Sequence, residues 1–249
     1  MKLIDMPLLV TENINPIIFD IINCIKDYLK ILIVLLAILL FVRFILKVKG
    51  ELFRKSLHIV AYTSTLCIYY VAVNWQIATL SCILFAIVVY PILHICERWT
   101  GFSDLLTERK PGEIKKSLLL LFFTDGILIA IAGYFNLPYT VVAAILMWGM
   151  GDTSAALIGK RYGKHKVKLP LADPKKSYEG TFSMFLTAFI IGSIVLKLMT
   201  NYALGVILIS SCLSSIVGAY VELISHNGND TVYVPSAIVI VLIILSYIF

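Results

Sequence analysis

The sequence predicts an all-α membrane protein: a polytopic bundle of about eight transmembrane helices, preceded by an N-terminal helix at the membrane surface. Hydrophobic residues make up 60% of the 249 residues and charged residues only 14%. The mean hydropathy is +0.94. No soluble domain can bury that much apolar surface. No hydrophilic stretch is long enough for a second domain, so we expect one transmembrane domain over 28–249 after an interfacial segment over 1–27.

The elements are predicted from apolar segments and their spacing. Residues 16–27 carry apolar side chains at helical spacing, with Pro16 near the start, which favours a helix lying along the membrane surface. Residues 1–15 lack the pattern of a cleavable signal peptide, so the first span is expected to act as the insertion signal. Eight spans of about 20 residues, the length that crosses the hydrocarbon core, are then expected at 28–48, 57–74, 76–93, 117–134, 139–158, 180–199, 202–221 and 232–249.

The positive charges predict the orientation of the bundle. Of the 21 Lys and Arg residues, 17 fall in three segments that an eight-span arrangement places on one side, namely 43–55, 98–116 and 160–176. The positive-inside bias makes that side cytoplasmic and places both termini on the other side. The net charge of +6 is then explained by anionic headgroups and phosphates, and no nucleic-acid partner is expected.

Polar residues cluster at that same predicted face. At the start of the second span, Arg54 and His58 share one helix face. Lys55 beside them is either a snorkelling anchor or a site residue, whereas His58 lies one turn deeper and needs a polar partner. In the fifth span, Asp152 is an intramembrane acid, which costs roughly 3 kcal/mol or more and indicates function. The small residues around it also predict a close helix–helix contact.

The next segment, 159–179, is a basic loop with seven Lys or Arg residues, and it leads into the sixth span. It does not match a Walker A loop, because Ser154 and Arg161 occupy positions where glycine and Ser or Thr are required. Ser177 and Glu179 are expected as the cap and first-turn residue of the following helix, whose N-terminus favours anions. The loop before the last span adds polar residues in a tight turn after Glu222.

In order and spacing these residues resemble the family of CTP-dependent lipid-alcohol kinases, which includes dolichol kinase, phytol and farnesol kinases and the CTP-using diacylglycerol kinase. The resemblance covers about residues 50–240 and is greatest to the short phytol- and farnesol-kinase-like members. It rests on Arg54-Lys55-x-x-His58, Gly151-Asp152 followed by small residues and Gly159, Arg161-Tyr162-Gly163, Lys176-Ser177-x-Glu179-Gly180-Thr181, and Glu222 with Asn229-Asp230 and Val234-Pro235. Those members often carry Asp-Asp-Asn before Val-Pro; this chain has Asn229-Asp230-Thr231, so one acid is missing.

The resemblance implies a membrane-embedded catalytic domain that transfers the γ-phosphoryl group of CTP to the hydroxyl of a lipid alcohol, such as a polyprenol, phytol, farnesol or diacylglycerol. Mg²⁺ is the expected cofactor, because carboxylates and substrate phosphates are its usual ligands. The expected catalytic residues are His58, Asp152, Glu179 and Glu222, and the last three are also the expected metal ligands. The expected nucleotide- and phosphate-binding residues are Arg54, Lys55, Gly151, Lys160, Arg161, Lys176, Ser177, Gly180, Thr181, Asn229 and Asp230. Either His58 or a carboxylate would accept the hydroxyl proton.

Two other classes of protein remain as alternatives. A phosphatidate cytidylyltransferase would use similar groups but attack the α-phosphate of CTP. The chain lacks that family's longer C-terminal signature of adjacent glycines and an Asp-Arg pair. A transporter would also place acids in the membrane, but it should show internal repeats and broken helices. Here the polar residues crowd one face.

Overall fold

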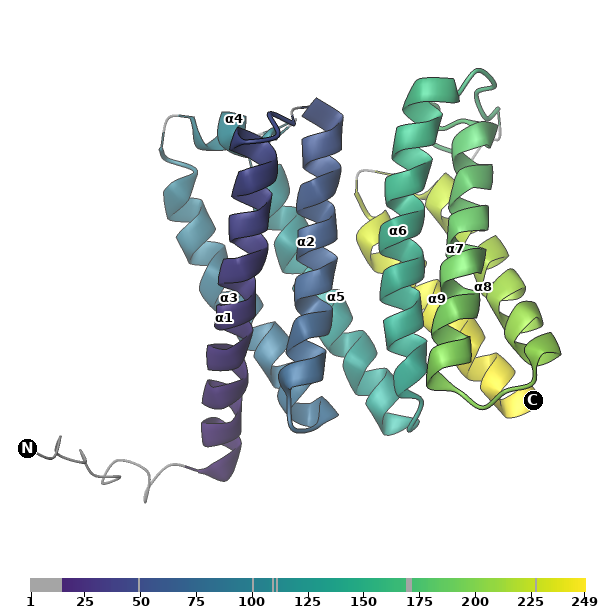
Figure 1. Ribbon diagram of the computed structural model, residues 1–249, viewed down its shortest axis with the longest axis horizontal. Helices are drawn as coiled ribbons and strands as arrows, with labels where there is room; N and C mark the ends of the chain where they lie inside the picture. The colour runs from purple at the N-terminus through teal and green to yellow at the C-terminus, as the bar shows by residue number, and fades with distance from the viewer. Residues whose placement is uncertain are drawn as a thin grey trace, which may run out of the picture.

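The computed structural model describes residues 15–48, 50–99, 101–108, 110, 112–168, 172–226 and 228–249. Over these residues the helices are α1 (Pro16–Phe44), α2 (Gly50–Val71), α3 (Trp75–Cys96), α4 (Phe102–Leu106), α5 (Glu113–Tyr134), α6 (Pro138–Tyr162), α7 (Tyr178–Met199), α8 (Leu204–Ile224) and α9 (Asp230–Ile248). The long helices run up and down one common direction, and the short α4 lies at their upper end (Figure 1).

The predicted all-α membrane bundle is confirmed. Six of the described helices, α3 and α5 to α9, are long and apolar enough to cross a membrane. Each of the eight predicted spans falls on one long helix. The segment 94–116 contains the end of α3, the five-residue α4 and the start of α5.

The N-terminal region differs from the prediction. Residues 16–44 form one continuous helix, α1, where the sequence predicts a surface helix followed by a separate span. The side chain of Asn15 caps α1 by accepting a hydrogen bond of 3.0 Å from the backbone N–H of Ile17. No Gly or Pro interrupts the helix after Pro16, so nothing breaks it near residue 27. Residues 1–14, which hold most of the expected interfacial segment, lie outside the described residues.

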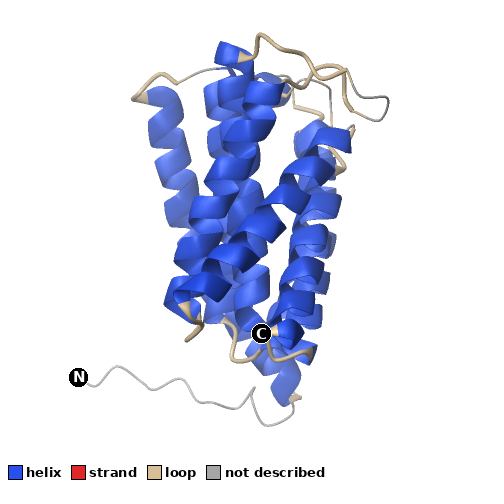
Figure 2. Ribbon diagram, turned by 90° about the vertical axis from the view of Figure 1, so that its right-hand side faces the viewer, coloured by secondary structure: helices blue, strands red, loops and turns tan. Residues whose placement is uncertain are grey.

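The bundle has two halves, which are joined through α6 and through a contact between α5 and α9. In Figure 1, α1, α2, α3 and α5 lie on one side and α6 to α9 on the other. Helix α6 contacts α2 and α5 as well as α7, α8 and α9. The start of α1 and the C-terminus lie at the lower end, and the longer connections lie at the upper end (Figure 2). The three basic segments therefore share one end of the molecule, as predicted.

The small residues of α6 pack against α7, as the sequence predicts. A Cβ atom added to Gly151 would lie 3.1 Å from the side chain of Met184 in α7. One added to Gly180 of α7 would lie 3.0 Å from the carbonyl oxygen of Ala155 and 3.3 Å from Cα of Gly159. These distances leave no room for larger side chains. The close contact fixes the end of α6 against the start of α7.

Candidate active site

Four segments that the sequence singles out come together near the upper end of the bundle. They are the start of α2, the end of α6, the start of α7 and the junction of α8 and α9. Side chains from all four form two ion pairs and a shared electrostatic environment. We call the set Lys55, Asp152, Lys176, Glu222 and Asp230 the acid–lysine cluster.

The first ion pair joins α2 to α6. The Nζ atom of Lys55 donates to Oδ2 of Asp152 over 2.6 Å. Lys55 is only 3% exposed, so it does not reach out to lipid headgroups as a snorkelling anchor would. Both groups lie where water is scarce, and each is stabilised chiefly by the other.

The second ion pair joins the segment before α7 to the end of α8. The Nζ atom of Lys176 lies 2.6 Å from Oε1 of Glu222, and it also donates to the backbone oxygen of Glu222. Glu222 is 6% exposed. The lysine thereby neutralises a buried carboxylate and one of the backbone carbonyls at the C-terminus of α8.

The two pairs belong to one electrostatic unit. Asp152 interacts with Lys176 as well as Lys55. Asp230, in the first turn of α9, interacts with Asp152 and with both lysines, and Glu222 interacts with Asp152 and Asp230. The acid–lysine cluster therefore combines three carboxylates with two lysines. These side chains come from segments that the sequence predicts to lie at one face of the bundle.

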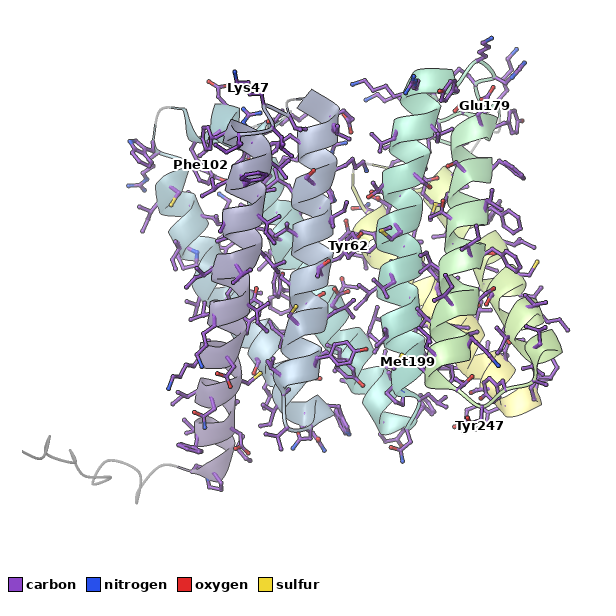
Figure 3. The ribbon with its side chains drawn as sticks, in the orientation of Figure 1. Lys47, Tyr62, Phe102, Glu179, Met199 and Tyr247 are labelled. Atoms are coloured by element: carbon purple, nitrogen blue, oxygen red, sulfur yellow. The ribbon has the colours of Figure 1, made fainter. Side chains whose placement is uncertain are left out.

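Glu179 lies outside the acid–lysine cluster, at the upper edge of the bundle where α7 begins (Figure 3). Its carboxylate accepts hydrogen bonds from the backbone N–H groups of Lys164 and His165, over 3.2 and 3.1 Å. Nδ1 of His165 lies 2.7 Å from the same carboxylate oxygen. Glu179 therefore holds the basic loop against α7. The sequence predicts that Glu179 lies with Asp152 and Glu222, and in the structure it does not.

The structure gives Mg²⁺ no ready-made cage. Among the described residues, no group of three His, Cys, Asp or Glu side chains is arranged to hold a metal ion. Asp152 and Glu222 are instead neutralised by lysines. Such a site still suits Mg²⁺, because this ion is usually held by one or two carboxylates together with substrate phosphates and water. Asp152 and Glu222 would provide the carboxylates, and Lys55 and Lys176 would bind phosphate oxygens.

The predicted phosphate-binding residues at the start of α7 have structural roles. Ser177 is the expected helix cap, because its hydroxyl accepts a hydrogen bond of 3.2 Å from the backbone N–H of Gly180. The hydroxyl of Thr181 donates to the backbone oxygen of Ser177. An isolated bridge between Lys166 and Ser177 folds the basic loop back onto this turn. These contacts hold Lys176 in place beside Glu222.

The remaining predicted residues lie outside the acid–lysine cluster. Arg54 pairs with Glu51 and lies 3.8 Å from Glu113 of α5. Lys160 is exposed and lies 3.8 Å from Glu51. Arg161 is also exposed and stacks on Tyr162, next to it in the chain. Asn229 precedes α9 and is partly buried. Lys49, residues 169–171 and Asn227, which belong to the predicted segments, are outside the described residues.

An apolar cavity of about 350 Å³ opens beside the acid–lysine cluster and runs between α1, α2, α3 and α5. Arg54, His58 and Glu113 line its polar mouth, and leucine, valine and phenylalanine side chains line most of the rest. His58 also interacts electrostatically with Asp152. Thr231, next to Asp230, lies on the cavity wall. The cavity and the acid–lysine cluster therefore meet at His58.

The sequence reasoning missed this cavity and with it Glu113 and Trp148, which line it. Glu113 is the first residue of α5, and a charged residue at a helix start is too common to indicate a site. Trp148 lies four residues before Asp152 on the same helix face, and that spacing could have indicated it.

The fold and site define a polytopic membrane protein in which an acid–lysine cluster adjoins a largely apolar cavity. The chain belongs to the cytidylyltransferase family, whose model matches residues 9–246. It is 32% identical over 117 residues to the phytol kinase of Synechocystis sp. (strain ATCC 27184 / PCC 6803 / Kazusa). That match spans 46% of this chain and 49% of the relative, about half the length of each. No solved structure matches the chain significantly. The resemblance inferred from the sequence is confirmed at the level of the family.

Proposed function

We propose that this protein is a kinase that transfers the γ-phosphoryl group of CTP to the hydroxyl of a lipid alcohol at the cytoplasmic face of a membrane. The observation that carries the proposal is the junction at His58 between the acid–lysine cluster and the apolar cavity. A lipid chain in the cavity would bring its hydroxyl to the cluster. The family and the phytol kinase relative support this reaction type. The basic segments at the same end support the cytoplasmic position.

Phosphoryl transfer needs alignment of the acceptor and neutralisation of charge more than covalent chemistry from the protein. Lys55 and Lys176 are suited to bind phosphate oxygens, because each is a point charge on a flexible stem. Bound Mg²⁺ would neutralise charge on the phosphates. Asp152 and Glu222 are the residues that would hold it, with Asp230 beside them.

In this proposal His58 would accept the hydroxyl proton. It lines the cavity mouth, where the hydroxyl of a bound lipid would lie, and it interacts with Asp152. A neutral imidazole can take the proton directly, and the nearby carboxylate stabilises the imidazolium that forms. Arg54, one turn from His58 on α2, and Glu113 of α5 would orient the hydroxyl.

The proposal is tested with purified protein in detergent, Mg²⁺, lipid alcohols and phosphatidate, and CTP labelled at either the α- or the γ-phosphate. We expect label to enter the lipid only from γ-labelled CTP. Entry only from α-labelled CTP would identify a cytidylyltransferase, the alternative that the name of the family favours. Absence of transfer from either nucleotide, with protein shown to be folded, would overturn both.

The contacts of Glu179 lead to a prediction that distinguishes two roles for its side chain: holding the basic loop in place and binding the metal ion. Glu179→Gln keeps one acceptor oxygen for the N–H groups of Lys164 and His165, so we expect turnover to fall by less than about tenfold, or about 1.4 kcal/mol. The Mg²⁺ concentration for half-maximal activity should not change, whereas trypsin should cleave the basic loop faster. Glu222→Gln is the matched comparison and should raise the Mg²⁺ requirement. An equal rise in Glu179→Gln would restore Glu179 as a metal ligand.

A further inference from the structure

Three aromatic rings lie at the end of the apolar cavity that is farthest from Arg54 and Glu113. The ring centroids of Tyr28 and Phe85 are 4.9 Å apart, and those of Phe85 and Phe122 are 4.7 Å apart. The three residues come from α1, α3 and α5, and all three line the cavity. Tyr28 and Phe122 are 0% and 2% exposed. We call this contiguous set the aromatic floor.

The distance from the mouth to the aromatic floor follows from the helices. On α5 the cavity is lined from Glu113 to Phe122, and on α3 from Leu93 to Phe85. The lining stretches on α1 and α2 are longer, from Leu39 to Tyr28 and from Arg54 to Ser64. At about 1.5 Å of rise per residue the four stretches span about 12–17 Å. An extended hydrocarbon advances about 1.3 Å per carbon, because its single bonds of about 1.5 Å zigzag. About nine to thirteen backbone carbons therefore fit between the mouth and the floor.

Resting on the proposed kinase function, we propose that the aromatic floor sets the length of the acceptor chain and selects alcohols of about three isoprene units. Each isoprene unit supplies four backbone carbons, so a chain of three units reaches the floor. A fourth unit would meet the buried rings of Tyr28 and Phe122 and the partly buried ring of Phe85. Cores are packed too tightly for such rings to move aside at low cost. The rings thus act as a specificity determinant well away from the transferred phosphoryl group.

The test measures binding and turnover separately along a series of isoprenoid alcohols with two, three and four units and a long polyprenol. Binding is measured without nucleotide, by displacement of radiolabelled farnesol from the purified protein. Turnover is measured as transfer of label from γ-labelled CTP. For the wild-type protein, both affinity and kcat/KM should be greatest at three units. Flat profiles of affinity along the series would overturn the proposal.

Two variants shift the floor in opposite directions. Phe122→Ala removes a floor ring and should raise the preference for four units over three by at least about tenfold, the lower range for a methylene-sized change in an apolar pocket. Ala61→Leu fills the cavity above the floor and should move the optimum toward two units. Phe123→Ala is the matched control, because Phe123 follows Phe122 on α5 and does not line the cavity. Unchanged length preference in both cavity variants would overturn the proposal.

The two readouts keep this inference distinct from the proposed reaction. Wild-type protein that binds alcohols with the expected length preference but transfers no γ-label would overturn the kinase assignment and leave the aromatic floor as a length selector. Protein that transfers γ-label equally to every length would support the kinase and overturn the selector.

Discussion

Replacing Asp152 with asparagine is expected to lower phosphoryl transfer by about a hundredfold to a thousandfold, the usual cost of removing one group that manages transition-state charge. Asp152 lies at the centre of the acid–lysine cluster, paired with Lys55 and interacting with Lys176. The bundle should stay folded, because the variant leaves two carboxylates beside two lysines. Initial rates with γ-labelled CTP measure the first effect. Size-exclusion profile and thermal midpoint in detergent measure the second.

A second acid in the membrane region provides the matched control for this result. Asp125 of α5 is 0% exposed and accepts a hydrogen bond of 2.7 Å from Thr65, and it takes no part in the acid–lysine cluster. Asp125→Asn should therefore retain transfer activity. Normal turnover in well-folded Asp152→Asn protein would remove Asp152 from the metal site. Equal losses in both variants would indicate a general need for buried acids.

The helices could be predicted because the properties that define them are local. Each span is an apolar segment of the required length, and charged residues or Gly- and Pro-containing turns separate it from the next. The beginning of α1 is harder to predict from the sequence. Residues 16–27 are amphipathic and contain Asp20, Lys26 and Asp27, so their composition suggests a surface helix. Only the absence of a helix breaker after Pro16 favours the continuous α1 that the structure shows.

The gathering of Lys55, Asp152, Lys176 and Glu222 could also be predicted, since the topology of eight spans brings their helix ends to one face. The pairing within the cluster could not, because either lysine could have met either carboxylate. The direction in which the Glu179 side chain points could not be predicted from the sequence, for a related reason. Its carboxylate binds N–H groups at Lys164 and His165, and the path of that loop depends on tertiary contacts.

The apolar cavity could not be predicted from the sequence either. Leucines that line a cavity have the same spacing along a helix as leucines that fill a core, so periodicity does not separate them. The aromatic floor needs rings from α1, α3 and α5, three helices whose relative rotation is set only by packing. The sequence alone does not define the acceptor lipid. The depth of the cavity down to the aromatic floor restricts the chain length of that lipid.

Lys55→Met is expected to destabilise the protein far more than Asp152→Asn, although both variants break the same ion pair. Removing the lysine leaves three carboxylates with Lys176 alone, and buried charges without partners cost about 3–5 kcal/mol. Lys55 is 3% exposed and the methionine side chain is of similar length, so little of the loss comes from packing. The thermal midpoint in detergent should fall clearly below that of wild type and of Asp152→Asn.

The double variant Lys55→Met/Asp152→Asn tests the physical reason. It leaves two carboxylates with one lysine, which restores the wild-type excess of one negative charge in the acid–lysine cluster. Stability should therefore recover toward wild type, while phosphoryl transfer stays as low as in Asp152→Asn. A double variant that is less stable than Lys55→Met alone would mean that the side chain of Asp152 contributes more through hydrogen bonding than through charge. Recovery of stability without activity would show that this ion pair stabilises the site through charge balance, while the reaction requires its individual members.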